Sequence, residues 1–236
     1  MRAFVVAWRS LVTFYNELFF LVGINLIWWA TGGIFVLVMA LLGWPLFVAN
    51  GPWWLAPLLA IPAGPATAAL AVVARRCARD IHVDRSYYWD GFRKYWKQAL
   101  GVSAIGMGGL ALLLLNLLFY VGQGNALLQA VAFLWLYIII FWLAMQIYVY
   151  PVLVSLEKPT VLGALKTAAL AAFANPLYSL LLLVVAIVLT VVSVVLAMLV
   201  LFAWPALIVL LGQHSLRLFL ERLGIKVDDD SYGSSA

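Results

Sequence analysis

Residues 75–97 read RRCARDIHVDRSYYWDGFRKYWK and form a hydrophilic island between long apolar segments. Ten of the 23 charged residues of the chain lie in this island. The flanking segments are apolar over at least the roughly 20 residues that a helix needs to cross a bilayer. The island therefore marks a stretch outside the bilayer between membrane-embedded parts.

The composition extends this interpretation to the whole chain. Of its 236 residues, 67% are hydrophobic and 10% are charged, and the mean hydropathy is +1.10. A soluble domain needs far more charged residues to cover its surface. Because long apolar runs recur along the chain, we predict an all-α fold, a polytopic transmembrane helical bundle.

The apolar runs predict six spans in a single transmembrane bundle over residues 1–227. The predicted spans are residues 18–48, 53–74, 99–121, 126–156, 177–202 and 204–220. Amphipathic cytoplasmic helices are predicted at 85–98 and 160–175, and an interfacial helix precedes the first span. The polar tail, residues 228–236, is expected to be disordered.

The distribution of Lys and Arg predicts the orientation. If the N-terminus is inside, all 14 Lys and Arg residues fall on the cytoplasmic side, and the three opposite turns carry no charge. Cytoplasmic loops are enriched in Lys and Arg, so we predict that both termini are cytoplasmic in a multi-pass protein of the bacterial plasma membrane. Anionic lipid headgroups on that side are expected partners, because each nearby basic residue contributes about 1 kcal/mol.

Small residues predict where helices pack closely. In the second and third spans, small side chains and prolines recur at positions that let another helix approach. The predicted helix-packing residues are Gly64, Pro65, Thr67, Ala71, Gly101, Ala104 and Gly108. The first span is longer than a bilayer requires, so either a tilt of the helix or a bend near Thr31, Gly32 and Gly33 is expected to absorb the excess.

The island ends in a helix with two unlike faces. Aromatic residues follow helical spacing on one face, and basic residues lie toward the other. The predicted membrane- or partner-docking residues are Trp89, Phe92, Arg93, Lys94, Trp96 and Lys97. The helix can lie on the membrane surface, or it can dock a cytoplasmic protein, and the two roles are compatible. Membrane proximity explains the mixed aromatic and basic composition, so no nucleic acid partner is expected.

The sequence contains no nucleophile elbow, zinc-protease motif, phosphate loop or dinucleotide fingerprint. Asp80, His82 and Asp84 alternate and could approach one metal, but a further ligand is not evident, and a solvated loop is the favoured interpretation. Cys77 is interpreted as a reduced cytoplasmic thiol. No catalytic residue, metal site or cofactor is predicted.

Polar residues inside the predicted spans are few. No Asp, Glu, Lys or Arg lies at the centre of a span, whereas ion-coupled transporters usually bury such groups there. Hydrogen bonds between helices explain Asn25, Asn116, Gln129 and Gln146. Glu17, at the inner edge of the first span, is expected to pair with an arginine of the island.

Two stretches carry a family resemblance. GPATAAL at 64–70 and WDGFRKYWKQA at 89–99, with Tyr150-Pro151 and Asn175-Pro176, resemble the YesL-type family of bacterial membrane proteins. The resemblance implies six spans, no known catalytic residues, and genes often found near carbohydrate ABC importers and glycan-degrading enzymes. The chain departs from the family pattern at Trp96, where asparagine is common.

These observations favour a non-enzymatic accessory or scaffold subunit of a plasma-membrane complex, with a carbohydrate ABC importer as the partner that the resemblance implies. The alternative is an autonomous transporter or channel for a neutral or lipid-like solute, lined by Asn25, Asn116 and Gln146. A membrane-embedded enzyme is a third hypothesis, which would require Asp80, His82 and Asp84 to cluster with His214 around a metal.

Overall fold

The structure is a computed structural model that describes residues 2–38, 41, 52–81, 83–123 and 125–222. All regular secondary structure in these ranges is helical, which confirms the predicted all-α fold. The predicted disordered tail, residues 228–236, lies outside the described residues.

The N-terminal part of the chain forms a bent helical path. Helix α1 (Arg2–Asn16) is followed by α2 (Leu18–Trp28), a π-helical turn η1 (Trp29–Gly33) and α3 (Ile34–Val38). The π-helical turn falls at the predicted bend, and a Cβ atom on Gly32 would collide with that of Ala66. Residues 39–40 and 42–48 of the predicted first span lie outside the described residues.

The second predicted span has two parts. Its first part, η3 (Trp53–Ala63), is a 3-10 helix, and its second part, α4 (Gly64–Cys77), is an α-helix. The 3-10 segment contains Pro57 and Pro62, which lack the N–H donor of other residues. After α4, Asp80 adopts a left-handed conformation with φ of 55°, and the Ile81 N–H donates to the Arg76 carbonyl at 3.2 Å. This arrangement satisfies a terminal carbonyl and ends the helix.

The amphipathic segment and the third predicted span form one helix. Helix α5 (Ser86–Val121) runs without interruption for 36 residues, which corresponds to a length of about 54 Å. It packs antiparallel along α4, with Gly91 against Ala69 and Gly64 against Ala99. The segment 85–98 is therefore the first part of a long helix and not a separate surface helix.

Five further helices follow in the part of the chain that the structure describes. They are α6 (Ala126–Ser155), α7 (Val161–Ala174), α8 (Pro176–Val195), α9 (Met198–Phe202) and α10 (Trp204–Arg222). Thr160 caps the start of helix α7. Its hydroxyl accepts a hydrogen bond from the Gly163 N–H at 3.2 Å. Asn175 separates α7 from α8, whose first residue is Pro176.

Among the described residues, five helical segments are long and apolar enough to cross a membrane, one fewer than the six predicted. They are Leu18–Val38, Trp53–Cys77, Ser86–Val121, Leu128–Ser155 and Pro176–Val195. These segments support a multi-pass membrane protein. The predicted sixth span, 204–220, lies in α10, whose second half carries Gln213, His214 and Arg217 and is therefore less apolar.

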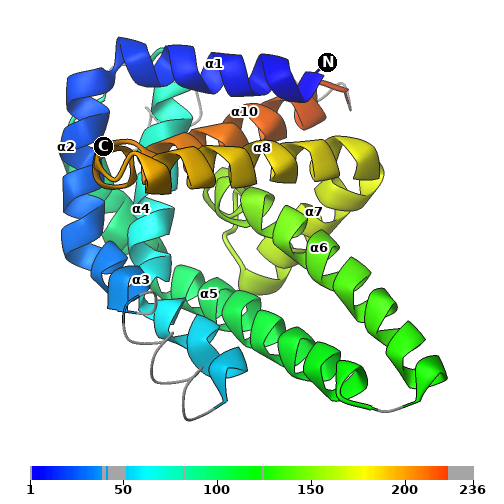
Figure 1. Cartoon of the computed structure of the whole chain (residues 1–236). Coiled ribbons are helices and arrows are strands. Elements are labelled where there is room, and N and C mark those ends of the chain that lie inside the picture. Colours follow the sequence, from blue (N-terminus) through cyan, green and yellow to red (C-terminus); the bar gives the residue numbers. More distant parts are fainter. Residues whose placement is uncertain (1, 39–40, 42–51, 82, 124, 223–236) are drawn as a thin grey trace.

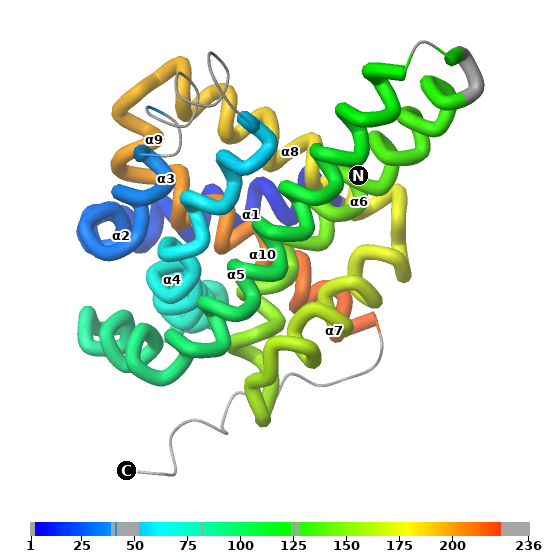
Figure 2. Tube along the Cα trace, turned by 90° about the horizontal axis from the view of Figure 1, so that it is seen from below, coloured from blue at the N-terminus to red at the C-terminus, as the bar shows by residue number. Residues whose placement is uncertain are grey.

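Helices α4 and α10 lie at the centre of the fold. Leu70, Ala71 and Val73 of α4 and Leu210 and Leu211 of α10 are fully buried. Figure 1 shows α1, α8 and α10 side by side and crosswise to α2 and α4. In Figure 2 the end of the hairpin, formed by the last part of α5 and the first part of α6, projects from the remaining helices. The candidate spans therefore do not follow one common direction.

Candidate functional site

The first part of α5 has one buried and one exposed face. Tyr88, Gly91 and Tyr95 are buried against the helical core, whereas Trp89 and Trp96 are each 44% exposed. The three predicted cations are exposed, and Phe92 is half-buried at the boundary between the two faces. We call the six predicted docking residues the α5 face: Trp89, Phe92, Arg93, Lys94, Trp96 and Lys97.

Side-chain contacts hold the aromatic and basic parts of the α5 face together. The Trp89 and Phe92 rings meet edge to face with their centroids 6.2 Å apart. The Lys97 ammonium lies 5.4 Å from the centroid of the Trp96 ring, within the range of a cation–π contact. The α5 face therefore offers apolar rings beside positive charge, which suits a protein surface that carries carboxylates next to apolar groups. Docking itself stays a prediction.

The predicted packing residues of α4 lie inside the fold. A Cβ atom on Gly64 would lie 2.7 Å from the Ala99 carbonyl oxygen, so α4 and α5 touch backbone to backbone at this point. Pro65 is buried, and the Thr67 hydroxyl accepts a hydrogen bond from the Trp28 indole at 3.2 Å. Ala71 is fully buried, and its carbonyl accepts a hydrogen bond from the Gln213 amide at 3.0 Å.

The predicted packing residues of the third span lie in different surroundings. A Cβ atom on Gly101 would lie 2.8 Å from Val161 at the start of α7. Ala104 is exposed, and a Cβ atom on Gly108 would have no neighbour within 4 Å. Two glycines that the spacing did not single out, Gly106 and Gly109, instead lie against α6.

Trp142 of α6 explains the close approach at these two glycines. Its indole N–H donates to the Gly106 carbonyl at 3.0 Å, and its ring fills the space that a Cβ atom on Gly109 would need. The signal in the sequence was present, because Gly106 and Gly109 share one helix face with spacing of three. The partner residue lies 36 positions away and could not be paired with them from spacing.

The expectation that hydrogen bonds between helices explain the polar residues of the predicted spans is confirmed for Asn25 and wrong for Asn116 and Gln129, which bond locally. The Asn25 amide donates to the Phe202 carbonyl at 2.6 Å, and its oxygen accepts from the Ala206 N–H at 3.0 Å. Asn25 thus joins α2 to the break between α9 and α10. Asn116 bonds to its own helix at the Leu112 carbonyl, at 2.8 Å.

The two glutamines of the predicted spans, Gln129 and Gln146, also differ in their hydrogen bonding. Gln129 donates to the Gln123 carbonyl at 3.0 Å across the turn before α6. The Gln146 side chain lies against Gly106, and its buried amide nitrogen has no hydrogen-bond partner among the described residues.

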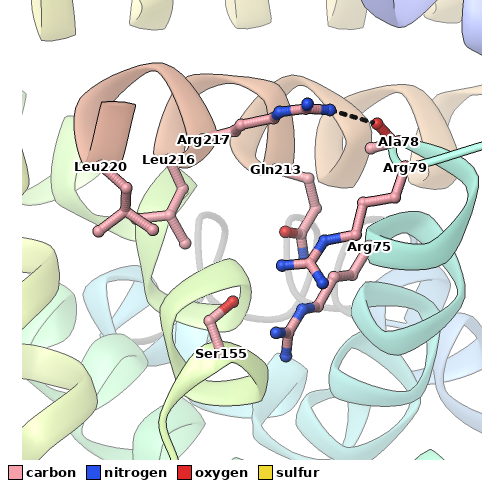
Figure 3. A pocket seen from close by; sticks show the side chains of 8 residues that line it. All are labelled: Arg75, Ala78, Arg79, Ser155, Gln213, Leu216, Arg217 and Leu220. Carbon is pink, nitrogen blue, oxygen red and sulfur yellow. Dashed lines mark hydrogen bonds between the residues drawn. The ribbon is translucent and has the colours of Figure 1, made fainter. Parts of the chain in front are cut away.

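A pocket at the ends of three helices was not predicted from the sequence (Figure 3). It lies between the C-terminal ends of α4 and α6 and the second half of α10. The lining residues are Arg75, Ala78, Arg79, Ser155, Gln213, Leu216, Arg217 and Leu220. Arg75 and Arg79 belong to the island, but nothing in the spacing indicated that Arg217, more than 130 residues later, lies beside them.

Two of the pocket arginines bind the ends of neighbouring helices. The Arg75 guanidinium donates to the Val154 carbonyl near the end of α6, at 2.6 Å. The Arg217 guanidinium donates to the Ala78 carbonyl just after α4, at 3.1 Å, and also pairs with Glu221 at 3.1 Å. Such terminal carbonyls have no partner within their own helix, so these arginines tie α4, α6 and α10 together.

The remaining candidate residues do not form a reactive cluster in the part of the chain that the structure describes. Groups of three His, Cys, Asp or Glu residues suitable for a metal are not found among the described residues, and His82 of the alternating triplet lies outside them. His214 instead lies 3.2 Å from the Thr13 hydroxyl. Among the described residues the ion pair found joins Arg217 and Glu221, so the expected pairing of Glu17 with an island arginine is not observed.

Comparison with known proteins finds a similarity to one family over part of the chain. Residues 46–120 match the family model described as "Protein of unknown function, DUF624", the family to which YesL-type proteins belong, and this confirms the resemblance drawn from the sequence. The matched region includes η3, α4, the island and α5 up to Tyr120. No curated protein and no solved structure matches the chain.

Proposed function

We propose that this protein is a non-enzymatic accessory subunit of a bacterial plasma-membrane complex, and that the α5 face binds the partner. The matched family has no established function, so the proposal depends on the geometry of the island. The partner is a membrane protein or membrane complex with a cytoplasmic surface. A carbohydrate ABC importer is the partner class that the YesL-type resemblance implies.

The continuity of α5 carries this proposal. The part from Ala99 to Val121 spans about 34 Å and is by itself sufficient for a hydrocarbon layer of about 30 Å. The preceding residues 86–98 continue the same axis by about 20 Å. A helix that lies on a membrane surface has to turn away from the axis of its span. A helix that continues that axis leaves the bilayer and presents the α5 face to a neighbouring protein.

Helix α7 extends the proposed docking region. Gly101 of α5 lies against Val161 at the start of α7, so the two elements are adjacent. On α7 the buried residues are alanines, whereas Leu162, Leu170 and Phe173 are each more than 60% exposed. A partner that binds beside the α5 face can therefore also reach exposed apolar side chains of α7.

We further propose six spans with both termini in the cytoplasm. Three contacts at one end of the fold support this arrangement: Thr13 of α1 with His214 of α10, Arg217 with Ala78 after α4, and Arg75 with Val154 of α6. They bring the N-terminal helix, the island and the second half of α10 together. Termini that share one side of a membrane require an even number of crossings.

In this proposal α8 and α10, which lie crosswise to α2 and α4 in the fold (Figure 1), form the fifth and sixth crossings. Near the start of α8, Tyr178 bonds to Ser215 in the second half of α10, at 2.9 Å. Near the end of α8, Thr190 accepts a hydrogen bond from the indole of Trp204, the first residue of α10, at 2.9 Å. The two helices are therefore antiparallel, and α10 returns the chain to the side from which α8 starts.

The test is gentle solubilisation of native bacterial membranes, capture of the tagged protein, and native mass measurement of what is bound. We expect a stoichiometric second protein with the wild-type chain and at least a tenfold lower yield of it with Trp96→Ala, since buried aromatic residues often dominate an interface by about 2 kcal/mol or more. Phe119→Ala, which removes an exposed ring at the far end of α5, is the matched control. A single unaccompanied species in all three preparations would contradict the proposal and favour the autonomous transporter.

A further inference from the structure

Helix α7 continues the surface that begins on the α5 face. Gly101 of α5, which lies against Val161 at the start of α7, follows Lys97 by one turn on the same side of α5. The exposed side of α7 therefore begins beside the basic part of the α5 face. We call this side, whose residues are all exposed and recur every three or four positions, the α7 face: Leu162, Lys166, Leu170 and Phe173.

The two faces share one composition, in which cations lie beside apolar side chains. On α5, Arg93 and Lys97 lie one turn apart next to the exposed indole rings. On α7, Lys166 lies one turn from an exposed leucine on either side. All three cations are exposed, and within the described ranges no ion pair involves any of them. They are therefore available to carboxylates of another molecule.

The charge of the combined surface is positive. Residues 86–98 carry three cations and one carboxylate, and residues 161–174 carry one cation and no carboxylate. Just before each helix the formal charges balance: Asp84 with Arg85, and Glu157 with Lys158. The N-terminus of α7, which meets α5 at Gly101, adds about half a positive charge. The positive excess favours an occupant that carries carboxylates.

The geometry of the surface favours a helix as the occupant. All regular secondary structure in the described ranges is helical, so these ranges offer no strand edge to which an extended peptide could add. A helix that crosses both faces can insert its side chains between those of α5 and α7. Arg93 and Lys97 are about 6 Å apart along α5, and carboxylates four residues apart on another helix have the same spacing.

Two other occupants are disfavoured. Copies of this chain in one membrane have the same orientation, so a symmetric contact through these faces would bring their cations together, and like charges oppose association. The headgroup layer of the membrane is disfavoured by the continuity of α5, which carries the α5 face along the axis of its span and beyond the bilayer. An acidic protein segment meets neither objection.

We propose that the occupant is an acidic amphipathic helix of the partner protein, which lies across the α5 face and the α7 face. Its carboxylates pair with Arg93, Lys97 and Lys166, and its apolar side chains pack on Trp96 and Leu170. This inference rests on the proposed function, because it names the chemistry of the partner at the same surface. A partner that binds through another kind of surface would leave the proposed function intact and remove this inference alone.

The test uses the full chain in phosphatidylcholine nanodiscs and two fluorescent helical peptides of about 18 residues, or five turns. Both peptides have a leucine face, and beside it one has Glu and the other Gln at two positions four residues apart. Fluorescence anisotropy measures their affinities. We expect the wild type to bind the Glu peptide about tenfold more tightly than the Gln peptide, because ion pairs form at a partly dehydrated interface.

Variants assign this preference to the two faces. Lys97→Gln should reduce the preference about threefold, and the double variant Lys97→Gln/Lys166→Gln should remove most of it. Both side chains are exposed, so the substitutions leave the packing of the fold unchanged. Arg9→Gln, which removes an exposed cation on α1, is the matched control and should keep the wild-type preference.

The outcomes separate this inference from the proposed function. Equal affinity of the wild type for the two peptides, or equal losses in Arg9→Gln and the double variant, would overturn the inference. Displacement of the Glu peptide by phosphatidylglycerol vesicles, with the same dependence on Lys97 and Lys166, would assign both faces to an anionic membrane and also overturn it. A stoichiometric native partner together with equal peptide affinities would retain the proposed function and reject only the acidic helix.

Discussion

At the scale of single residues, a glycine can let the backbone of a neighbouring helix approach closely, because it has no side chain. Gly64 brings the α4 backbone against α5, with 2.7 Å between its would-be Cβ atom and the Ala99 carbonyl oxygen. Gly108 lies on the same long helix as Ala99 and would meet nothing within 4 Å. The two glycines therefore predict opposite responses to the same substitution.

Gly64→Ala should lower the thermal stability of the protein, because the new methyl group meets backbone atoms that cannot move independently. Overpacking of this kind typically costs about 1–3 kcal/mol. Gly108→Ala should be neutral or stabilising by about 0.5–1 kcal/mol, because alanine favours a helix more than glycine does. Thermal unfolding of both variants in one detergent is the measurement. Equal stability of the two variants would show that Gly64 is not a point of close packing.

Spacing predicted a small-residue face on α4 because small residues recur there every three or four positions, at Gly64, Thr67 and Ala71, and therefore lie on one side of a helix. It did not distinguish Gly108 from Gly106 and Gly109 on α5. That distinction depends on the rotation of α5 relative to α6, which Trp142 fixes through its bond to Gly106. A contact between residues 36 positions apart leaves no local pattern in the sequence.

At the scale of elements, the main difference from the sequence-based prediction is α5. Charged residues end at Lys97, and the change in composition after it suggested a boundary between a surface helix and a span. The composition changes there, but neither Pro nor Gly, which would end a helix, occurs among residues 98–100. The helix therefore continues from Ser86 to Val121.

Spin labels at Trp89 and Leu112, both exposed on α5, test this continuity. The uninterrupted helix places the two backbone positions about 35 Å apart. A right-angle bend near Gln98, as a helix lying on the membrane requires, would shorten the separation to about 25 Å. Pulsed electron spin resonance in lipid nanodiscs resolves this difference, with labels at Leu112 and Phe119 as a short internal reference.

At the scale of the whole molecule, α10 is the element that hydropathy describes least well. Its middle residues Gln213, His214 and Ser215 are all less than 10% exposed, so their polar side chains form hydrogen bonds inside the fold. Gln213 bonds to α4, His214 to α1 and Ser215 to α8. The sequence indicated a membrane protein and showed which of its loops carry the Lys and Arg residues. It could not indicate that this less apolar helix lies at the centre.

Cysteine labelling tests the proposed six-span orientation. In a Cys77→Ala background, single cysteines at Gln123 and Ala197 should react with an impermeant maleimide from outside intact cells, and a cysteine at Lys158 should react only after lysis. The reason is that the first two lie in turns without charge, whereas Lys158 follows α6 on the basic side. Labelling of Ala197 and Lys158 from the same side would mean that α8 does not cross the membrane.

The central claim is that the α5 face binds a protein partner, and photo-cross-linking in intact cells tests it most directly. A photoreactive amino acid replaces Trp96 in one strain and Phe119, the exposed ring at the other end of α5, in a second strain. We predict a discrete protein adduct from position 96 and only lipid adducts from position 119. Lipid adducts alone at both positions would contradict the account and assign the α5 face to the membrane surface.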